Sequence, residues 1–253
     1  MKIALLADTH SNLEALQACL AHAQHQGAGM YVFLGDLVGY GADPVACLNL
    51  IATFAEQGAL LVRGNHDEAA LGGMCEKMNP TAREAIYWTR QQLGARENAL
   101  LSTLPMTARH GDLLFVHASA HKPESWPYVQ SRSQAELCIN AANAVVCFVG
   151  HVHHQVLYWS PKPGERNPSS GVHSFVPTPG VAIPLTPSRH WLAIAGSVGQ
   201  PRDGNNAAAY ALFEDELRLL TFFRVPYDHQ TAARKVVAAG LPEQLAAQLL
   251  RGD

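Results

Sequence analysis

The sequence carries KIALLADTH at residues 2–10, where a short apolar run ends abruptly in polar side chains. An unbroken apolar run is typical of a strand that is covered on both faces, as in a parallel sheet. Asp8, Thr9 and His10 stand at the carboxyl end of this predicted strand. In open α/β sheets, ligands bind in the crevice outside such strand ends. The run therefore predicts a parallel sheet and the edge at which its chemistry lies.

Strands alternate with helices outward from this run. Ser11 and Asn12 are favourable N-cap residues, and leucines at helical spacing follow them. Further strands are predicted at residues 30–34, 59–62, 113–117 and 144–149, with helices at 44–54, 80–92 and 133–142. Strands without intervening helices are then predicted at 155–159, 171–176, 191–195, 208–213 and 217–225, and two helices at about 229–239 and 242–250.

A parallel α/β part followed by a mostly antiparallel part predicts two sheets packed in one domain. We expect a single domain over residues 1–253, with a helical extension over about residues 228–253. Residues 160–170 are rich in Pro, Gly and Ser and predict an exposed loop.

The composition excludes several classes of protein. Apolar residues make up 48% and charged residues 15%, which indicates a globular chain, and the net charge of -3 argues against a nucleic-acid polymer as partner. The apolar run near residue 2 is too short for a secretory signal, and no apolar stretch is long enough to span a membrane. We expect a cytoplasmic protein. The odd number of cysteines, five, argues against a disulfide framework, and the oligomeric state stays open.

Metal-binding side chains recur at the carboxyl ends of the predicted strands. Besides Asp8 and His10, they are Asp36 after Gly35, Asn65 with His66 and Asp67 after Gly64, His117, and His151 with His153 after Gly150. Singly, each has an ordinary explanation as a turn, cap or core residue. Together, five segments deliver Asp, His and Asn to one edge of a sheet, and this favours a metal site.

The spacing adds detail. If the backbone is extended, Asp8 and His10 point to one face, and the same alternation pairs His151 with His153 while excluding His154. Gly35 and Gly64 each directly precede a ligand position. We expect the missing Cβ to allow close approach or unusual dihedral angles.

These motifs resemble the full motif set of the calcineurin-like metallophosphoesterases, over residues 1 to about 205. The segment GSVGQPRD at 196–203 is similar to the small bacterial branch often called diadenosine tetraphosphatase-like or protein-phosphatase-like. The resemblance implies an α/β (α+β) fold, a four-layer sandwich of two mixed β-sheets flanked by helices.

The resemblance also implies two metal ions. One metal would be held by Asp8, His10 and His153 and the other by Asn65, His117 and His151, with Asp36 bridging them. This mixture of carboxylate, imidazole and amide oxygen suits Mn, Fe, Zn or Ni better than Ca or Cu(I). Hydroxide bridging the metals would attack phosphorus directly, without a covalent enzyme intermediate.

Two further roles follow from the same resemblance. His66 is the candidate proton donor to the leaving group. The protein-phosphatase pattern has an Asp and an Arg where this chain has Gly39 and Tyr40, so the partner of His66 stays open. Arg202 is the candidate phosphate-binding residue, because a guanidinium group can hold phosphate with two hydrogen bonds.

The predicted function is a metal-dependent phosphoesterase acting on a nucleotide or small phosphorylated metabolite, such as a dinucleoside polyphosphate. A serine/threonine protein phosphatase needs an open site, and residues 160–170 and 121–129 are expected to enclose it. The same motifs are also compatible with a cyclic-nucleotide phosphodiesterase. A metal-dependent binding module without turnover is disfavoured, because all seven ligand positions are intact.

Overall fold

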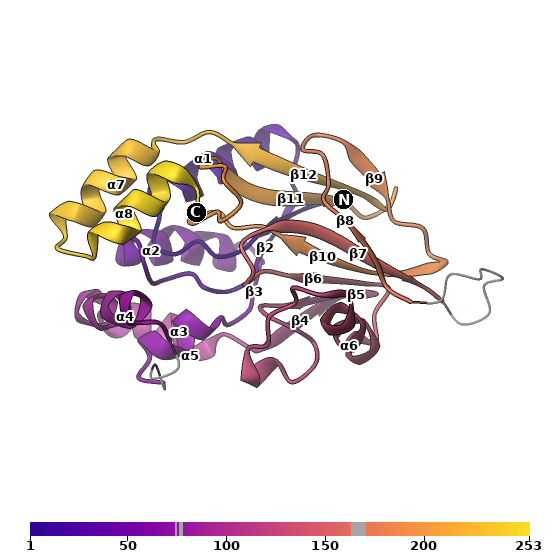
Figure 1. The fold of residues 1–253 in the computed structure, drawn as a ribbon, viewed down its shortest axis with the longest axis horizontal. Coiled ribbons are helices and arrows are strands. Elements are labelled where there is room, and N and C mark those ends of the chain that lie inside the picture. Colours follow the sequence, from indigo (N-terminus) through magenta and orange to yellow (C-terminus); the bar gives the residue numbers. More distant parts are fainter. Residues whose placement is uncertain (74, 76–77, 163–170) are drawn as a thin grey trace.

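The computed structural model describes residues 1–73, 75, 78–162 and 171–253. Within them, two six-stranded sheets pack face to face (Figure 1). The first sheet has the order β3-β2-β1-β11-β12-β9, with β1 at Lys2–Leu6, β2 at Met30–Phe33, β3 at Leu60–Leu61, β9 at Ala182–Pro184, β11 at Ala208–Glu214 and β12 at Leu219–Val225. The second has the order β4-β5-β6-β10-β7-β8, with β4 at Thr107–His110, β5 at Leu113–Val116, β6 at Val146–Val149, β7 at Gln155–Pro161, β8 at His173–Phe175 and β10 at Arg189–Ala195.

Both sheets are mixed, as predicted. β1, β2 and β3 are parallel, while β11 joins β1 antiparallel; in the other sheet β5, β6 and β10 are parallel, while β7 joins β10 antiparallel. The two parts of the chain therefore contribute strands to both sheets. Buried aromatic rings fill the space between the sheets: Phe148 stacks on Phe115 at 5.6 Å between ring centroids and meets Phe213 of the other sheet at 5.5 Å.

Helices form the outer layers. The described helices are α1 at Leu13–His25, α2 at Pro44–Glu56, α3 at Asn65–Ala70, α4 at Pro80–Gln92, α5 at Ala95–Thr103, α6 at Arg132–Ala142, α7 at His229–Ala238 and α8 at Glu243–Arg251. Apolar side chains of α1 and α2 pack on the first sheet, and those of α6 pack on the second. α7 and α8 form a hairpin (Figure 1), and its apolar side chains pack against those of α4 and against Tyr40.

Some predictions differ from the structure. Ser160 and Pro161 belong to strand β7, so the loop predicted at 160–170 begins too early, and its residues 163–170 lie outside the described part. α3, α5, β4 and β9 were not predicted, because they are short and bury few apolar side chains. All five cysteines are buried and unpaired by disulfides. None of the helices in the described ranges has the length and apolar character needed to cross a membrane.

Candidate metal centre

Backbone hydrogen bonds join the carboxyl ends of four strands in two pairs, one pair in each sheet. The amide of Asp8 donates to the carbonyl of Gly35 at 3.1 Å, and that of His10 donates to Asp36 at 2.9 Å. The amide of Gly150 donates to the carbonyl of His117 at 2.8 Å. These bonds join the segments that follow β1, β2, β5 and β6. All seven residues predicted as ligands meet here, and all but the half-buried Asn65 are buried.

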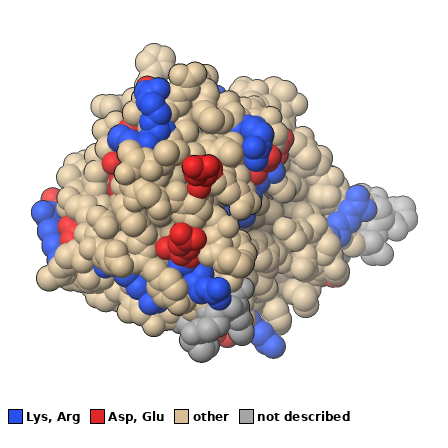
Figure 2. Space-filling view, turned by 60° about the vertical axis from the view of Figure 1, so that its left-hand side comes forward, with Lys and Arg blue, Asp and Glu red and all other residues tan. Residues whose placement is uncertain are grey.

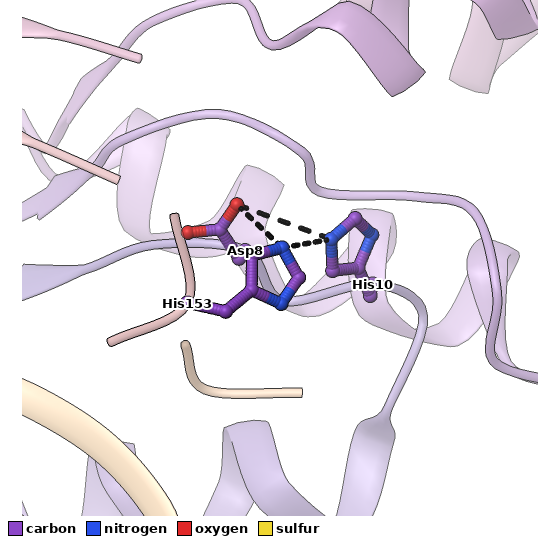
Figure 3. A group of neighbouring side chains, drawn as sticks. All are labelled: Asp8, His10 and His153. Atoms are coloured by element: carbon purple, nitrogen blue, oxygen red, sulfur yellow. Dashed lines mark hydrogen bonds and ion pairs between the residues drawn. The ribbon is translucent and has the colours of Figure 1, made fainter. Parts of the chain in front are cut away.

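The first group of ligand atoms comes from Asp8, His10 and His153 (Figure 3). Nε2 of His153 lies 3.2 Å from Nε2 of His10 and 3.3 Å from Oδ1 of Asp8. Both oxygens of Asp8 accept from the backbone amide of His151, at 2.9 and 3.1 Å. This contact fixes the carboxylate so that it faces both imidazole rings.

The second group comes from Asp36, His117 and His151. Nε2 of His117 lies 3.1 Å from Nδ1 of His151, 3.2 Å from Oδ1 of Asn65 and 3.4 Å from Oδ2 of Asp36. Four potential ligand atoms from four different segments therefore converge in this second group.

Asp36 lies between the two groups. Its Oδ2 is 3.4 Å from Nε2 of His117 and 3.7 Å from Nε2 of His10. Its Oδ1 accepts a hydrogen bond from the backbone amide of His66 at 2.8 Å, which leaves Oδ2 facing both groups. The geometry suits a carboxylate shared by two cations.

The histidine tautomers provide a test of whether cations fit. Nδ1 of His10 faces the carbonyl of Val38 at 3.1 Å, and Nδ1 of His153 faces that of Gln200 at 2.6 Å. A carbonyl only accepts, so each Nδ1 carries the proton. In neutral rings the two Nε2 atoms then point lone pairs at each other over 3.2 Å. A cation between the two Nε2 atoms would relieve this opposition. Metal-binding histidines usually donate the other ring N–H to a carbonyl or carboxylate, as both rings do here.

Glycines let the strand ends come this close. A Cβ on Gly64 would lie 2.1 Å from Oδ1 of Asp36, and one on Gly150 would lie 2.7 Å from Oδ2 of Asp8. Gly35 has a φ of +83°, and its Cβ would lie 2.7 Å from the backbone nitrogen of Gly64. The predicted roles of Gly35 and Gly64 in close approach are confirmed.

The extended backbone and the pairing of His151 with His153 that strand alternation predicted were wrong, although Asp8 and His10 do share a group. Asp8, His10, His151 and His153 have φ between 47 and 67°, so the backbone is left-handed at these residues and not extended. His151 and His153 are accordingly divided: His153 joins Asp8 and His10, and His151 joins His117. His154 is outside both groups, and its Nε2 lies 2.7 Å from the carbonyl of Arg202.

His66 is buried beside the centre, and one of its ring nitrogens lies within 4.8 Å of ligand atoms of both His10 and Asp36. Its Nδ1 has no hydrogen-bond partner among the described residues, and a Cβ on Gly39 would lie 2.4 Å from that atom. The rings of Tyr40 and His10 pack on His66 at 4.5 and 4.8 Å between centroids. Burial lowers the pKa of His66 to about 4, so its ring is neutral at pH 7. Packing, and not a hydrogen bond to Nδ1, therefore orients this ring.

Charges within the centre are strongly coupled in the metal-free protein. Burial would raise the pKa of Asp36, but His117, His66 and His10 hold it well below its usual value. Burial would lower the pKa of His117, but Asp36 and Asp8 raise it to about 9. Burial lowers the pKa of His151 to about 3. His117 is thus the ring that holds a proton against Asp36 until a cation replaces it.

Asp67 belongs to the same sequence motif as Asn65 and His66, and its role was not predicted. Its Oδ1 accepts from the amides of Leu37 at 2.8 Å and Val38 at 3.3 Å, and its Oδ2 accepts from the amide of Gly64 at 2.9 Å. The carboxylate therefore ties the start of α3 to the segment after Asp36. Its place three residues after Gly64 is the sequence signal, because this is the capping-box position.

Arg202 lies at the rim of the centre. Its guanidinium carbon is 5.5 Å from the ring centroid of Tyr40, and Nη2 donates to Oε1 of Gln200 at 2.7 Å. The backbone carbonyl of Gln200 accepts from Nδ1 of His153, and the backbone amide of Arg202 donates to the carbonyl of His153 at 3.4 Å, so Arg202 is tied directly to a ligand residue. Trp126 and Tyr128, within the predicted enclosing segment, line a cavity that reaches Asn65, His66 and His151. Tyr40 and these two aromatic residues were not predicted as site residues.

Comparison with known proteins agrees with this geometry. The family model of the calcineurin-like phosphoesterase superfamily domain matches residues 1–216. The uncharacterized protein MJ0912 of Methanocaldococcus jannaschii is 33% identical over 99% of this chain and 98% of its own length. A metallophosphoesterase from Sphaerobacter thermophilus is 36% identical, with a TM-score of 0.86 over the whole of both chains. Protein PH1004 from Pyrococcus horikoshii OT3, 19% identical, shares the fold with a TM-score of 0.77 over 100% of this chain and 98% of its own.

Proposed function

Because this chain belongs to the calcineurin-like phosphoesterase superfamily and is a phosphoric ester hydrolase, we propose that it acts with two metal ions at the centre described above. The observation that carries the proposal is the convergence of buried ligand atoms in two groups on either side of Asp36. Asp8, His10 and His153 would hold one ion, Asn65, His117 and His151 the other, and Asp36 both. The donor set suits Mn, Fe, Zn or Ni.

Bound ions would supply Lewis acidity that makes water nucleophilic and neutralises charge on the phosphoryl group. The protein residues would position the reactants. His66, neutral and beside Asn65, would donate a hydrogen bond to the phosphoryl or leaving oxygen. Arg202, at the rim, would bind phosphate oxygens. Asp36 and Asp8 are oriented by backbone amides, so their carboxylates need little rearrangement during turnover.

We propose a nucleotide or another small phosphorylated metabolite as substrate, with dinucleoside polyphosphates as one class. The cavity beside the centre has a volume of about 620 Å³, within the range of small-molecule sites. Its lining includes Trp126 and Tyr128 as well as Ala82 of α4, so at least two segments far apart in the chain border the site. Such walls disfavour a phosphorylated protein chain as substrate. We further propose that residues 1–253 act as one domain, because α7 and α8 pack on Tyr40 and α4.

Three variants test the proposal. Asp36→Asn and His117→Ala should each abolish hydrolysis of bis-p-nitrophenyl phosphate by the manganese-loaded protein, while circular dichroism shows a folded chain. His66→Ala should keep its metal content, measured by plasma mass spectrometry, and lose about 10²–10⁴-fold in kcat. Wild-type rates in Asp36→Asn or His117→Ala would refute the metal centre. Loss of metal in His66→Ala would instead make His66 a ligand.

A further inference from the structure

One cavity reaches the metal centre at Asn65, His66 and His151, and a second lies beside it, with Tyr40 lining both. The larger has a volume of about 620 Å³ and the smaller about 340 Å³. Asn79 also lines both, so the cavities meet along the edge formed by Tyr40 and the start of α4. The ring of Tyr40 lies 4.6 Å from that of His10 and 4.5 Å from that of His66. A phosphoryl group at the centre would therefore have space for an organic group on either side of Tyr40.

The larger cavity is aromatic and acidic. Tyr128 stacks on the ring of His151 at 4.0 Å and 17°, and Trp126 meets His117 edge-on at 5.9 Å. The lining also includes the carboxylates of Glu68 and Glu124. Stacked and edge-on rings favour a flat aromatic group. Two carboxylates disfavour a second anionic group there.

The smaller cavity has the opposite chemistry. Its described lining consists of Tyr40, Asn79, Pro80, Thr81, Arg202, Gln244, Leu245 and Gln248, and this set includes a cation and several amide donors but no carboxylate. A chain of contacts holds these groups in place. Nε2 of Gln200 donates to Oε1 of Gln248 at 3.4 Å, and Oε1 of Gln200 accepts from Nη2 of Arg202 at 2.7 Å. Such a lining favours an organic group rich in hydroxyl and carbonyl oxygens.

Part of the wall of the smaller cavity lies beyond the residues that the family model matches. The family model ends at residue 216, whereas Gln244, Leu245 and Gln248 belong to α8. Oγ1 of Thr81 donates to Oε1 of Gln244 at 3.3 Å, which joins α8 to α4 across the cavity. Figure 2, which turns this end of the molecule forward, shows Lys and Arg spread over the surface and not gathered into one patch. The single arginine of the smaller cavity is thus a local feature and not part of a broad basic face.

We propose that the smaller cavity is a second substrate subsite, which binds the polar arm of a phosphodiester whose aromatic arm lies in the larger cavity. This proposal rests on the proposed function, because it assigns the phosphoryl group to the metal centre between them. Tyr40 separates the two arms, Gln244 and Gln248 donate hydrogen bonds to the polar one, and Arg202 binds the phosphate between them. The α7–α8 hairpin accordingly selects the substrate while the family domain performs the hydrolysis.

Two substrates with the same charge and leaving group test the subsite. Methyl p-nitrophenyl phosphate and thymidine 5′-(p-nitrophenyl phosphate) are both diesters, and only the second carries a large polar arm. Gln244→Trp places a bulky ring at the cavity from an exposed position of α8. It should lower kcat/KM for the thymidine ester at least about tenfold and leave that for the methyl ester unchanged. Gln248→Leu, which removes donors without adding bulk, should raise KM for the thymidine ester alone.

Leu250→Trp is the matched control, because Leu250 is also exposed on α8 and lines neither cavity. It should leave both substrates unchanged. If Gln244→Trp and Gln248→Leu reduce both esters equally, or leave both unchanged, the subsite proposal is wrong. Failure of the proposed function looks different: the wild-type protein would then hydrolyse neither ester, or Asp36→Asn would hydrolyse both.

Discussion

Gly64→Ala probes how far the metal centre depends on the absence of one Cβ. Gly64 has φ -103° and ψ 171°, which any residue adopts, so alanine introduces no backbone strain. Its Cβ, however, would lie 2.1 Å from Oδ1 of Asp36 and 2.2 Å from the backbone nitrogen of Asp36. Ordinary contacts begin at 3.4 Å. The methyl group and Asp36 must therefore separate by more than 1 Å.

The size of this shift decides the expected result. Metal sites need their ligands within about 0.5 Å of the productive geometry, so the displaced Asp36 should no longer serve both groups. Overpacking a buried site typically costs about 1–3 kcal/mol of folding free energy. We therefore expect Gly64→Ala to fold with reduced stability and to lose both bound metal and hydrolysis of bis-p-nitrophenyl phosphate.

Gly94→Ala is a closely matched control. Gly94 caps α5 as Gly64 caps α3, and in each case the acidic residue three positions later accepts from the glycine amide. A Cβ on Gly94 would meet only Oε2 of Glu97, at 2.9 Å, the free end of an exposed side chain. Effects of alanine on the cap and on unfolded-chain entropy are common to both variants. If Gly64→Ala matches Gly94→Ala in metal content, activity and denaturation midpoint, the close-approach argument is refuted.

Two further predictions concern the stability of the metal-free protein and the pH dependence of its metal binding. Asp67→Asn places an amide donor opposite either the backbone amide of Gly64 or that of Leu37. Urea denaturation should therefore show a loss of about 1–3 kcal/mol in the free energy of unfolding. An unchanged denaturation midpoint would contradict the proposed tie between α3 and the segment after Asp36. The pKa of His117 is raised to about 9, so this ring is protonated at pH 7 and must lose its proton to bind a cation. Calorimetry in buffers of different ionisation enthalpy should detect proton release at pH 7, and metal affinity should rise with pH and level off above about 9; an affinity that is flat from pH 7 to 9 would exclude this assignment.

The sequence predicted which residues form the metal centre, but it did not predict the packing and the backbone conformation that position them. The apolar run ending in Asp8, and the later ones ending in Asp36 and His117, correctly placed the ligands at strand ends. The single sheet edge that we predicted was wrong, because Asp8 and Asp36 follow strands of the first sheet and His117 follows a strand of the second. Tyr40 and Trp126 were missed as site residues, because nothing local distinguishes an aromatic residue that lines a cavity from one in a core. Their positions depend on packing between segments far apart in the chain.

The left-handed backbone explains why strand alternation gave a wrong picture of the ligands. Asp8, His10, Asp36, His151 and His153 all have positive φ, and for residues with a Cβ this conformation costs roughly 1–2 kcal/mol each. Such a cost persists only where neighbouring contacts hold the backbone in place. Here they are the bonds of Asp8 and His10 to the segment of Asp36, and the contact of His153 with Gln200. The ligands are therefore positioned by bonds between segments. A single segment's pattern predicts which residues gather at the strand ends, but it does not predict which of the two groups each residue joins.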